Sequence, residues 1–168
     1  MELALNHNTI DSIAYYISNK YVILFLLSLL PVTELRLSLP IGILYFELSW
    51  IYVFIVCVAS NILIGIFLVL ALGKIIFICN KIPFLNRILK RLMVLSEDRY
   101  SKYERYKSRA LILFVGIPFP GTGAWTGSLV SHILGLSKNS SISAIIQGVI
   151  VSGIIMTVLS LSGKVIIG

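Results

Sequence analysis

Two short apolar segments of the chain are divided by Pro118-Phe119-Pro120-Gly121-Thr122-Gly123-Ala124. Proline removes a backbone hydrogen-bond donor and glycine permits tight turns, so this composition predicts a break in helical structure. The segment before the break, 110–117, and the segment after it, 126–136, are both shorter than the roughly 20 residues that a membrane-crossing helix needs. The stretch therefore predicts a re-entrant hairpin, which enters and leaves the membrane on the same side.

The same pattern occurs earlier in the chain, where residues 31–40 divide the apolar segments 21–30 and 41–46. Each pair of short segments is followed by a longer apolar segment, 50–78 or 141–167, that is long enough to cross a bilayer. Irregular backbone at membrane depth survives only where it is buried in protein or lines a wet cavity. Two halves of this form, in opposite orientations, predict the inverted repeats typical of secondary transporters.

The composition also indicates a membrane protein, because 58% of the residues are hydrophobic and only 12% are charged. An ordinary soluble domain has roughly 25% charged residues. We therefore expect an all-α integral membrane fold in a single membrane domain, 1–168. It would comprise a first half (9–79), a connector (80–109) and a second half (110–168).

The positive charge of the chain is concentrated between Lys74 and Arg109. This span holds ten basic and three acidic residues, so it carries the whole net charge of +7. Short loops rich in Lys and Arg remain in the cytoplasm, which predicts a multi-pass membrane protein with a cytoplasmic connector. The frequent Ile, Lys and Asn residues indicate a prokaryote, and so a prokaryotic plasma membrane. Leu85, Leu89 and Leu92 alternate with basic residues at helical spacing, as in an amphipathic helix at a membrane surface. The apolar flanks favour anionic lipid headgroups as the partner of this patch, and they argue against nucleic acid.

Two stretches carry a family resemblance: Glu34-Leu35-Arg36 with Pro40 and Gly42, and residues 117–127, Ile-Pro-Phe-Pro-Gly-Thr-Gly-Ala-Trp-Thr-Gly. They resemble the small multi-drug export protein family over about residues 22–165, and the resemblance implies export across a membrane. A more distant likeness is to the DedA/VTT-like membrane proteins, which pair two re-entrant hairpins and move lipid-linked phosphates. Those proteins typically carry arginines around the proline of the second hairpin, whereas Val115, Gly116 and Gly121 surround Pro118 here.

Glu34 is the first candidate for a transport residue. It is expected in a non-helical break between apolar segments, where a charge costs about 2.5–3.5 kcal/mol on insertion scales. A carboxyl group held there at such a cost can act as the proton-binding site of a coupled exporter. Alternatively, Glu34 pairs with Arg36 and only locks the hairpin. Arg36 itself either neutralises Glu34 or receives an anionic group of the substrate.

The remaining candidates for substrate or ion binding lie in the two breaks and in the two long segments. They are Pro40, Pro118, Pro120, Gly121, Thr122, Gly123, Trp125, Thr126, Asn61 and Gln147. The glycine-rich run offers backbone amides to a ligand and Trp125 offers a stacking surface, although Gly123 and Gly127 also have the spacing of a helix-packing motif. Asn61 and Gln147 lie midway along the long segments, where an amide lines an ion pathway or joins two helices by a hydrogen bond.

Three functions remain open from the sequence. The first is a secondary transporter that exports small amphipathic compounds with proton coupling, and the second is a DedA-like translocase of lipid or polyprenyl phosphate. The third is a membrane scaffold without transport. The chain lacks the His-Glu-x-x-His, Gly-x-Ser-x-Gly and Walker motifs, so we expect no enzyme activity, no metal and no cofactor. The expected partners are membrane lipids, protons, a small-molecule or lipid substrate, and a second copy that shields the short hairpins in a homodimer.

Overall fold

The regular structure of the protein is helical throughout the part that the computed structural model describes, residues 19–79 and 101–167. The elements are α2 (Lys20–Leu29), α3 (Glu34–Pro40), the π-helix η1 (Ile41–Tyr45), α4 (Trp50–Cys79), α6 (Ser101–Gly116), α7 (Ala124–Ile133) and α8 (Lys138–Ile167). The predicted all-α fold is therefore confirmed for these residues.

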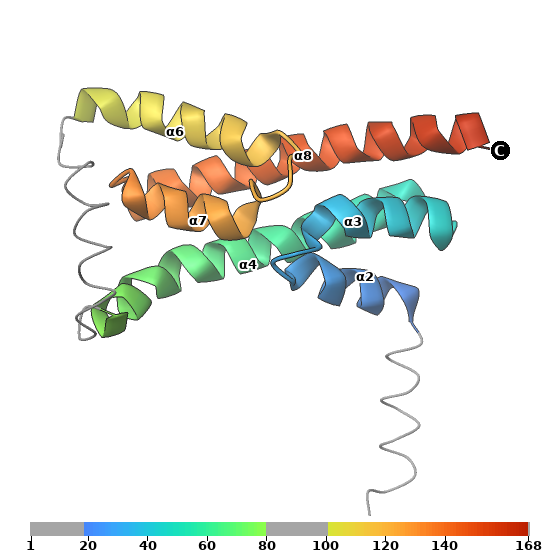
Figure 1. Ribbon diagram of the computed structural model, residues 1–168, viewed down its shortest axis with the longest axis horizontal. Helices are drawn as coiled ribbons and strands as arrows, with labels where there is room; N and C mark the ends of the chain where they lie inside the picture. Colours follow the sequence, from blue (N-terminus) through green and yellow to red (C-terminus); the bar gives the residue numbers. More distant parts are fainter. Residues whose placement is uncertain (1–18, 80–100, 168) are drawn as a thin grey trace, which may run out of the picture.

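Two long helices, α4 and α8, form the axis of the molecule and run in opposite directions (Figure 1). Each has 30 residues, and each contains a segment long and apolar enough to cross a membrane, Trp50–Leu72 in α4 and Lys138–Val165 in α8. Large apolar side chains on their outer faces, such as Phe67 and Ile154, are more than half exposed. In water such a surface would be costly, whereas acyl chains solvate it. These helices match the long segments predicted at 50–78 and 141–167.

The short helices form two pairs that approach each other from opposite ends (Figure 1). α2 and α3 extend to one end of the molecule, and α6 and α7 extend to the other. In each pair the chain reaches the middle of the molecule, breaks, and returns to the end from which it came. Buried side chains from both pairs and from both long helices form one core, which includes Leu24, Leu39, Val53, Cys57, Leu111, Val115, Ala124, Ile145 and Val149.

The predicted break over residues 31–40 is wrong in its second part. Only residues 31–33 separate α2 from α3, because Glu34 already begins a helix that runs through Pro40. The missing N–H of Pro40 does not end the helix, since the chain widens into the π-helix η1 directly afterwards. The backbone amides of Phe46 and Leu48 then donate to the carbonyls of Ile41 and Gly42 at 2.9 and 3.0 Å.

The second break lies where the sequence predicts it, between Gly116 and Ala124. Gly121 has a φ of 86°, a left-handed conformation that glycine adopts without steric cost. The helix before the break, α6, begins at Ser101 within the predicted connector and continues past residue 110. The amphipathic segment predicted around Leu85–Leu92 lies outside the described residues.

Candidate functional site

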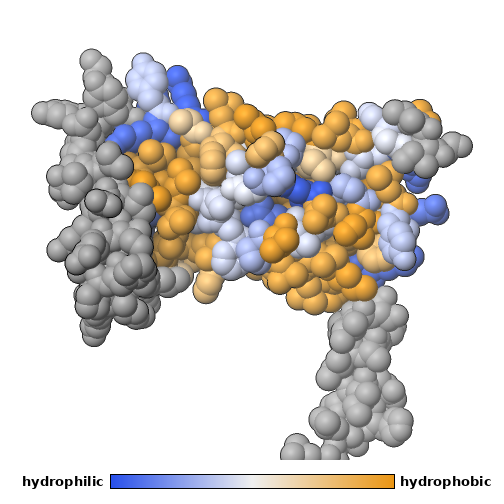
Figure 2. Space-filling model, viewed as in Figure 1, coloured by the Kyte–Doolittle hydropathy of each residue, from blue (hydrophilic) through white to orange (hydrophobic). Residues whose placement is uncertain are grey.

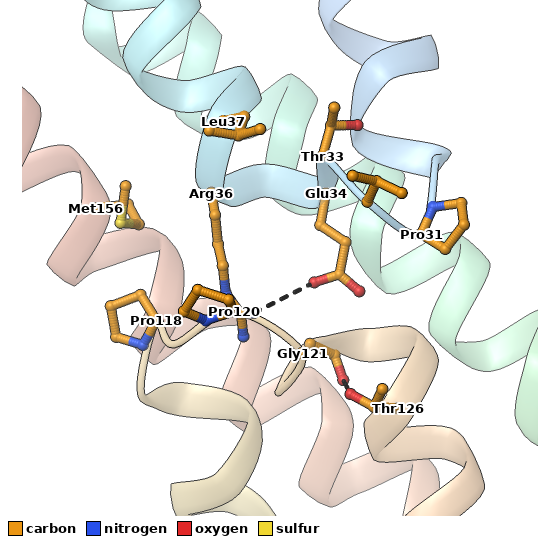
Figure 3. Close-up of a pocket in the computed structure, with 12 residues that line it drawn as sticks. Pro31, Thr33, Glu34, Arg36, Leu37, Pro118, Pro120, Gly121, Thr126 and Met156 are labelled. Carbon is orange, nitrogen blue, oxygen red and sulfur yellow. Dashed lines mark hydrogen bonds and ion pairs between the residues drawn. The ribbon is translucent and has the colours of Figure 1, made fainter.

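The two breaks face each other at the middle of the molecule and enclose a cavity of about 510 Å³. Its walls come from the first break and the start of α3, from the second break and the start of α7, and from one residue of α8. The lining residues are Pro31, Val32, Thr33, Glu34, Arg36, Leu37, Pro118, Pro120, Gly121, Gly123, Thr126 and Met156 (Figure 3). On the surface, a patch of neutral and hydrophilic residues appears at mid-length between hydrophobic flanks (Figure 2).

Glu34 lies at the inner edge of this cavity and points towards α7 (Figure 3). Its side chain is only 6% exposed. The backbone amide of Trp125, in the first turn of α7, donates to Glu34 Oε1 at 3.3 Å. A negative charge at this place is stabilised by the unpaired amides and the dipole at the start of a helix. Glu34 also has a φ of 45°, which is uncommon for a residue with a side chain and indicates local strain.

Gly123 makes room for this carboxylate. A Cβ atom at Gly123 would overlap the carboxylate group of Glu34, so no other residue type fits without displacing it. Gly127, one turn further along α7, has a different role, because a Cβ there would come within 2.5 Å of Val115 in α6. The structure thus shows close helix packing at Gly127, whereas ligand binding by the backbone amides of the glycine-rich run stays a prediction.

Arg36 extends from α3 to the second break. Its Nη1 donates to the carbonyl of Phe119, and its Nη2 donates to Thr122 Oγ1 at 2.8 Å. Nη1 lies 4.0 Å from Glu34 Oε2, so the two charges form an ion pair. Both members of this pair also bind the other pair of short helices, α6 and α7, or the loop between them. Thr122 Oγ1 is also within 2.9 Å of the carbonyls of Ile117 and Phe119, which fixes its position in the loop.

A third contact between the two pairs of short helices is made by a side chain of the second pair, α6 and α7. The indole Nε1 of Trp125 donates to the carbonyl of Leu29, the last residue of α2, at 3.0 Å. Trp125 is not among the residues that line the cavity. The broken helices therefore satisfy one another, since Glu34 binds the start of α7, Arg36 binds the loop after α6, and Trp125 binds the end of α2. Backbone groups that the breaks would leave unpaired are bonded across the junction.

Asn61 lies on the inner side of Glu34, in a narrow crevice that α3, α4, α6, α7 and α8 enclose. Its Nδ2 donates to the carbonyl of Ser28 at 3.1 Å, so it joins α4 to α2. Three buried polar atoms of residues lining this crevice, Asn61 Oδ1, Arg36 Nε and Ser152 Oγ, have no hydrogen-bond partner among the described residues. The crevice has no room for a water molecule in this conformation. Glu34 therefore lies between the open cavity and this closed crevice, together with Arg36 and Gly123, because these three residues line both.

Five of the predicted site residues do not line the cavity: Asn61, Thr122 and Trp125, whose contacts are given above, and Gln147 and Pro40. Gln147 is exposed, and its Nε2 donates to Ser143 Oγ in the same helix at 3.0 Å. Pro40 lies at the junction of α3 and η1 and does not line the cavity. Conversely, sequence reasoning missed the contributions of Thr33, Leu37 and Met156. Met156 is one apolar residue in a long apolar helix, so no signal in the sequence distinguishes it.

A family model described as "Putative small multi-drug export protein" matches residues 34–155, which is more than half of the chain. The matched region starts at Glu34 and includes Arg36, Asn61 and the whole second break. Comparison with curated proteins and with solved structures gave no match. The predicted family resemblance is thereby confirmed, and the chain belongs to the Putative small multi-drug export protein family.

Proposed function

We propose that the chain is a secondary transporter that exports small amphipathic compounds through the central cavity, with Glu34 as the proton-coupling residue. The observation that carries this proposal is the position of Glu34 between the open cavity and the closed crevice. A coupling site must be reached from one side of the membrane at a time, and in this conformation a carboxylate at such a boundary would be reached only from the cavity. The family description and the two membrane-capable helices support transport as the general function.

The cavity has a chemistry that suits an amphipathic compound. Pro31, Val32, Leu37 and Met156 offer apolar surface, while Glu34 contributes the one carboxylate among its lining residues. A volume of about 510 Å³ lies within the range of pockets that hold small organic ligands, roughly 300–1,000 Å³. A cationic group of the substrate and a proton would both be attracted to Glu34, and their competition for one carboxylate is a simple basis for exchange.

We further propose that each short helix pair is a re-entrant hairpin and that the two halves are inverted repeats. The paired short helices that return to their own end of the molecule support this topology, as does the opposite direction of α4 and α8. In this arrangement the connector, 80–109, is cytoplasmic. Outward opening would then separate one hairpin from the other at the contacts of Glu34, Arg36 and Trp125.

Translocation of a lipid or polyprenyl phosphate is the competing proposal, and Arg36 on the cavity wall is the observation in its favour. However, Nη1 and Nη2 of Arg36 already donate to Phe119 and Thr122. A phosphate would have to displace these contacts before it could bind the guanidinium in a bidentate manner. The geometry therefore favours export of small compounds.

The test is ethidium transport into inverted proteoliposomes under an imposed pH gradient. We expect uptake by the wild type, loss of uptake in Glu34→Gln, and normal uptake in Glu47→Gln, which removes an exposed carboxylate elsewhere in the chain. Equal uptake by all three proteins would remove Glu34 from the coupling mechanism. If the wild type moves a fluorescent polyprenyl phosphate and not ethidium, the competing proposal replaces this one.

A further inference from the structure

A second cavity, of about 470 Å³, lies between α6 and α8 at the end of the molecule away from Lys20 and Lys164. Its wall on α6 consists of Glu104, Arg105, Ser108, Arg109 and Ile112. These positions follow helical spacing, so they form one face of the helix. Ser140 and Gln147 of α8 form the opposite wall. Hydrophilic residues at this end of the described structure are visible in Figure 2.

The charges in this cavity are not balanced. The carboxylate of Glu104 accepts a hydrogen bond from the backbone amide of Ser137 at 3.2 Å, next to the start of α8. Hydrogen bonds from the side chains of Ser137 and Ser140 and from this amide hold the pKa of Glu104 below its ordinary value. Arg105 and Arg109 are exposed and make no hydrogen bond or ion pair within the described residues. Two guanidinium groups therefore remain free to bind an anion.

The arginines and the uncharged polar residues of the wall together indicate which class of anion the cavity would bind. Two guanidinium groups together with the hydroxyl of Ser108 and the amide of Gln147 supply donors that a phosphate group accepts. Gln147 lies seven residues beyond Ser140, which places it about 10 Å further along α8 towards the middle of the molecule. The cavity thus begins at the charged end and extends along the helices.

Beyond the cavity the same two helix faces become apolar. Leu113 follows Arg109 on α6, and Ile117 comes directly after the last residue of this helix; both are more than half exposed. On α8, Ile154 follows Gln147 with 52% exposure. Because α8 contains one of the two membrane-capable segments, the arginines lie near the end of that segment, at the height of lipid headgroups. A free anion would gain nothing from the apolar part, whereas a phospholipid would use both parts.

We propose that the cavity between α6 and α8 is a binding site for an anionic phospholipid, whose phosphate contacts Arg105 and Arg109 and whose acyl chains lie along the apolar continuation of the two helices. Basic pockets between helices at the cytoplasmic surface are suited to such headgroups. This site is separate from the central cavity and shares no lining residue with it. The proposal therefore does not depend on the transport function.

The experiment measures lipid binding to the purified full-length protein in an uncharged detergent by native mass spectrometry. The probes are phosphatidylglycerol, phosphatidylcholine and inorganic phosphate. We expect phosphatidylglycerol to bind at least about tenfold more tightly than phosphatidylcholine. Both lipids carry the phosphate, but the choline cation of phosphatidylcholine is repelled by the two guanidinium groups. We expect inorganic phosphate at millimolar concentration not to displace it.

The variant Arg105→Gln/Arg109→Gln tests the site, and Lys20→Gln/Lys164→Gln is its matched control. Both remove two exposed cations, but the control removes them from the opposite end of the molecule. We expect the arginine variant to lose the tenfold preference and the control to keep it. A third variant, Gln147→Leu, changes one exposed side chain of the wall, keeps the helix, and should weaken phosphatidylglycerol binding severalfold.

Several outcomes would overturn the proposal. An equal loss in both double variants would mean that general charge attraction holds the lipid. Displacement by inorganic phosphate would assign the site to a free anion. If the arginine variant does not fold, unchanged binding by Gln147→Leu contradicts the proposal on its own. Retained lipid binding in Glu34→Gln keeps this result distinct from that of the transport experiment.

Discussion

The two breaks at the centre of the molecule differ in what they contribute to their contact: charged side chains follow the first, and the second accommodates them. The first break, at residues 31–33, is followed directly by two charged side chains, Glu34 and Arg36, which both reach across to the other hairpin. The second break, from Ile117 to Gly123, offers a backbone carbonyl, the hydroxyl of Thr122 and space, and Gly123 has no side chain to obstruct the carboxylate. The first break should therefore be sensitive to removal of a side chain, and the second to addition of one.

The largest effect on stability is expected from Arg36→Gln, on the charged side of the junction. This change removes both donors to the second break and leaves the buried Glu34 carboxylate without its cation. Breaking one partner of a buried ion pair costs about 3–5 kcal/mol, and we expect the lower end because Arg36 is 13% exposed. Thermal unfolding in detergent measures the loss, and Lys164→Gln, an exposed cation far from the junction, should leave the midpoint unchanged. Equal midpoints for the two variants would contradict the comparison.

The next largest effect is expected from Gly123→Ala, on the side of the junction that provides space. The added Cβ overlaps the carboxylate of Glu34, so the hairpins must separate locally, at a cost of about 1–3 kcal/mol for overpacking. Gly163→Ala is the control, because a Cβ at Gly163 meets nothing within 4 Å.

A double variant makes the cause of this effect visible. In Glu34→Ala/Gly123→Ala the overlapping carboxylate is gone, so the second substitution should cost much less than in the wild type. Double-mutant cycles between contacting residues give interaction energies of about 0.5–3 kcal/mol. Additive losses would show that Gly123 is needed for a reason other than the approach of Glu34.

A smaller effect is expected from Trp125→Phe, which keeps the ring and removes the hydrogen bond to the carbonyl of Leu29. Loss of one such hydrogen bond costs about 1 kcal/mol. The backbone amide of residue 125 still donates to Glu34, so proton coupling should persist. If Trp125→Phe abolishes ethidium transport while the fold remains intact, the indole belongs to the transport site itself, as the sequence suggested.

The smallest effect is expected at Glu104, a solvent-accessible carboxylate that also binds a helix start across an interface. Because hydrogen bonds lower its pKa in the folded protein, Glu104 stabilises the α6–α8 contact above the pKa of the unfolded chain. That contribution is lost as the pH falls through the lower, folded pKa. The midpoint temperature of unfolding should therefore fall slightly between about pH 5 and pH 3 in the wild type. In Glu104→Gln, the part of this decrease that comes from Glu104 should be absent. An identical pH profile for both proteins would contradict the role of this contact.

The sequence predicted the elements of the fold well where their signals are local. The lengths of the apolar segments located α4 and α8, and the Pro- and Gly-rich stretch located the second break. The extent of the first break was wrong, because a π-helix accommodates Pro40 and proline alone does not reveal it. Several side chains that line the central cavity were identified from their type, as charged or small residues in apolar surroundings. Their pairing was not, because bonds such as Arg36 to Phe119 join residues 83 positions apart. Gln147 shows the same limit, since its position along a helix does not tell which neighbour it faces.

The most direct test of the central claim measures proton release when tetraphenylphosphonium is added to the purified protein in a weakly buffered solution. The account predicts proton release from the wild type and from Glu47→Gln, and no release from a folded Glu34→Gln. The side-chain carbonyl oxygen of the introduced glutamine can still accept the hydrogen bond from the backbone amide of Trp125, but this side chain has no carboxyl proton to release. Proton release of equal size from Glu34→Gln would contradict the account, because the cation would then displace a proton from another group.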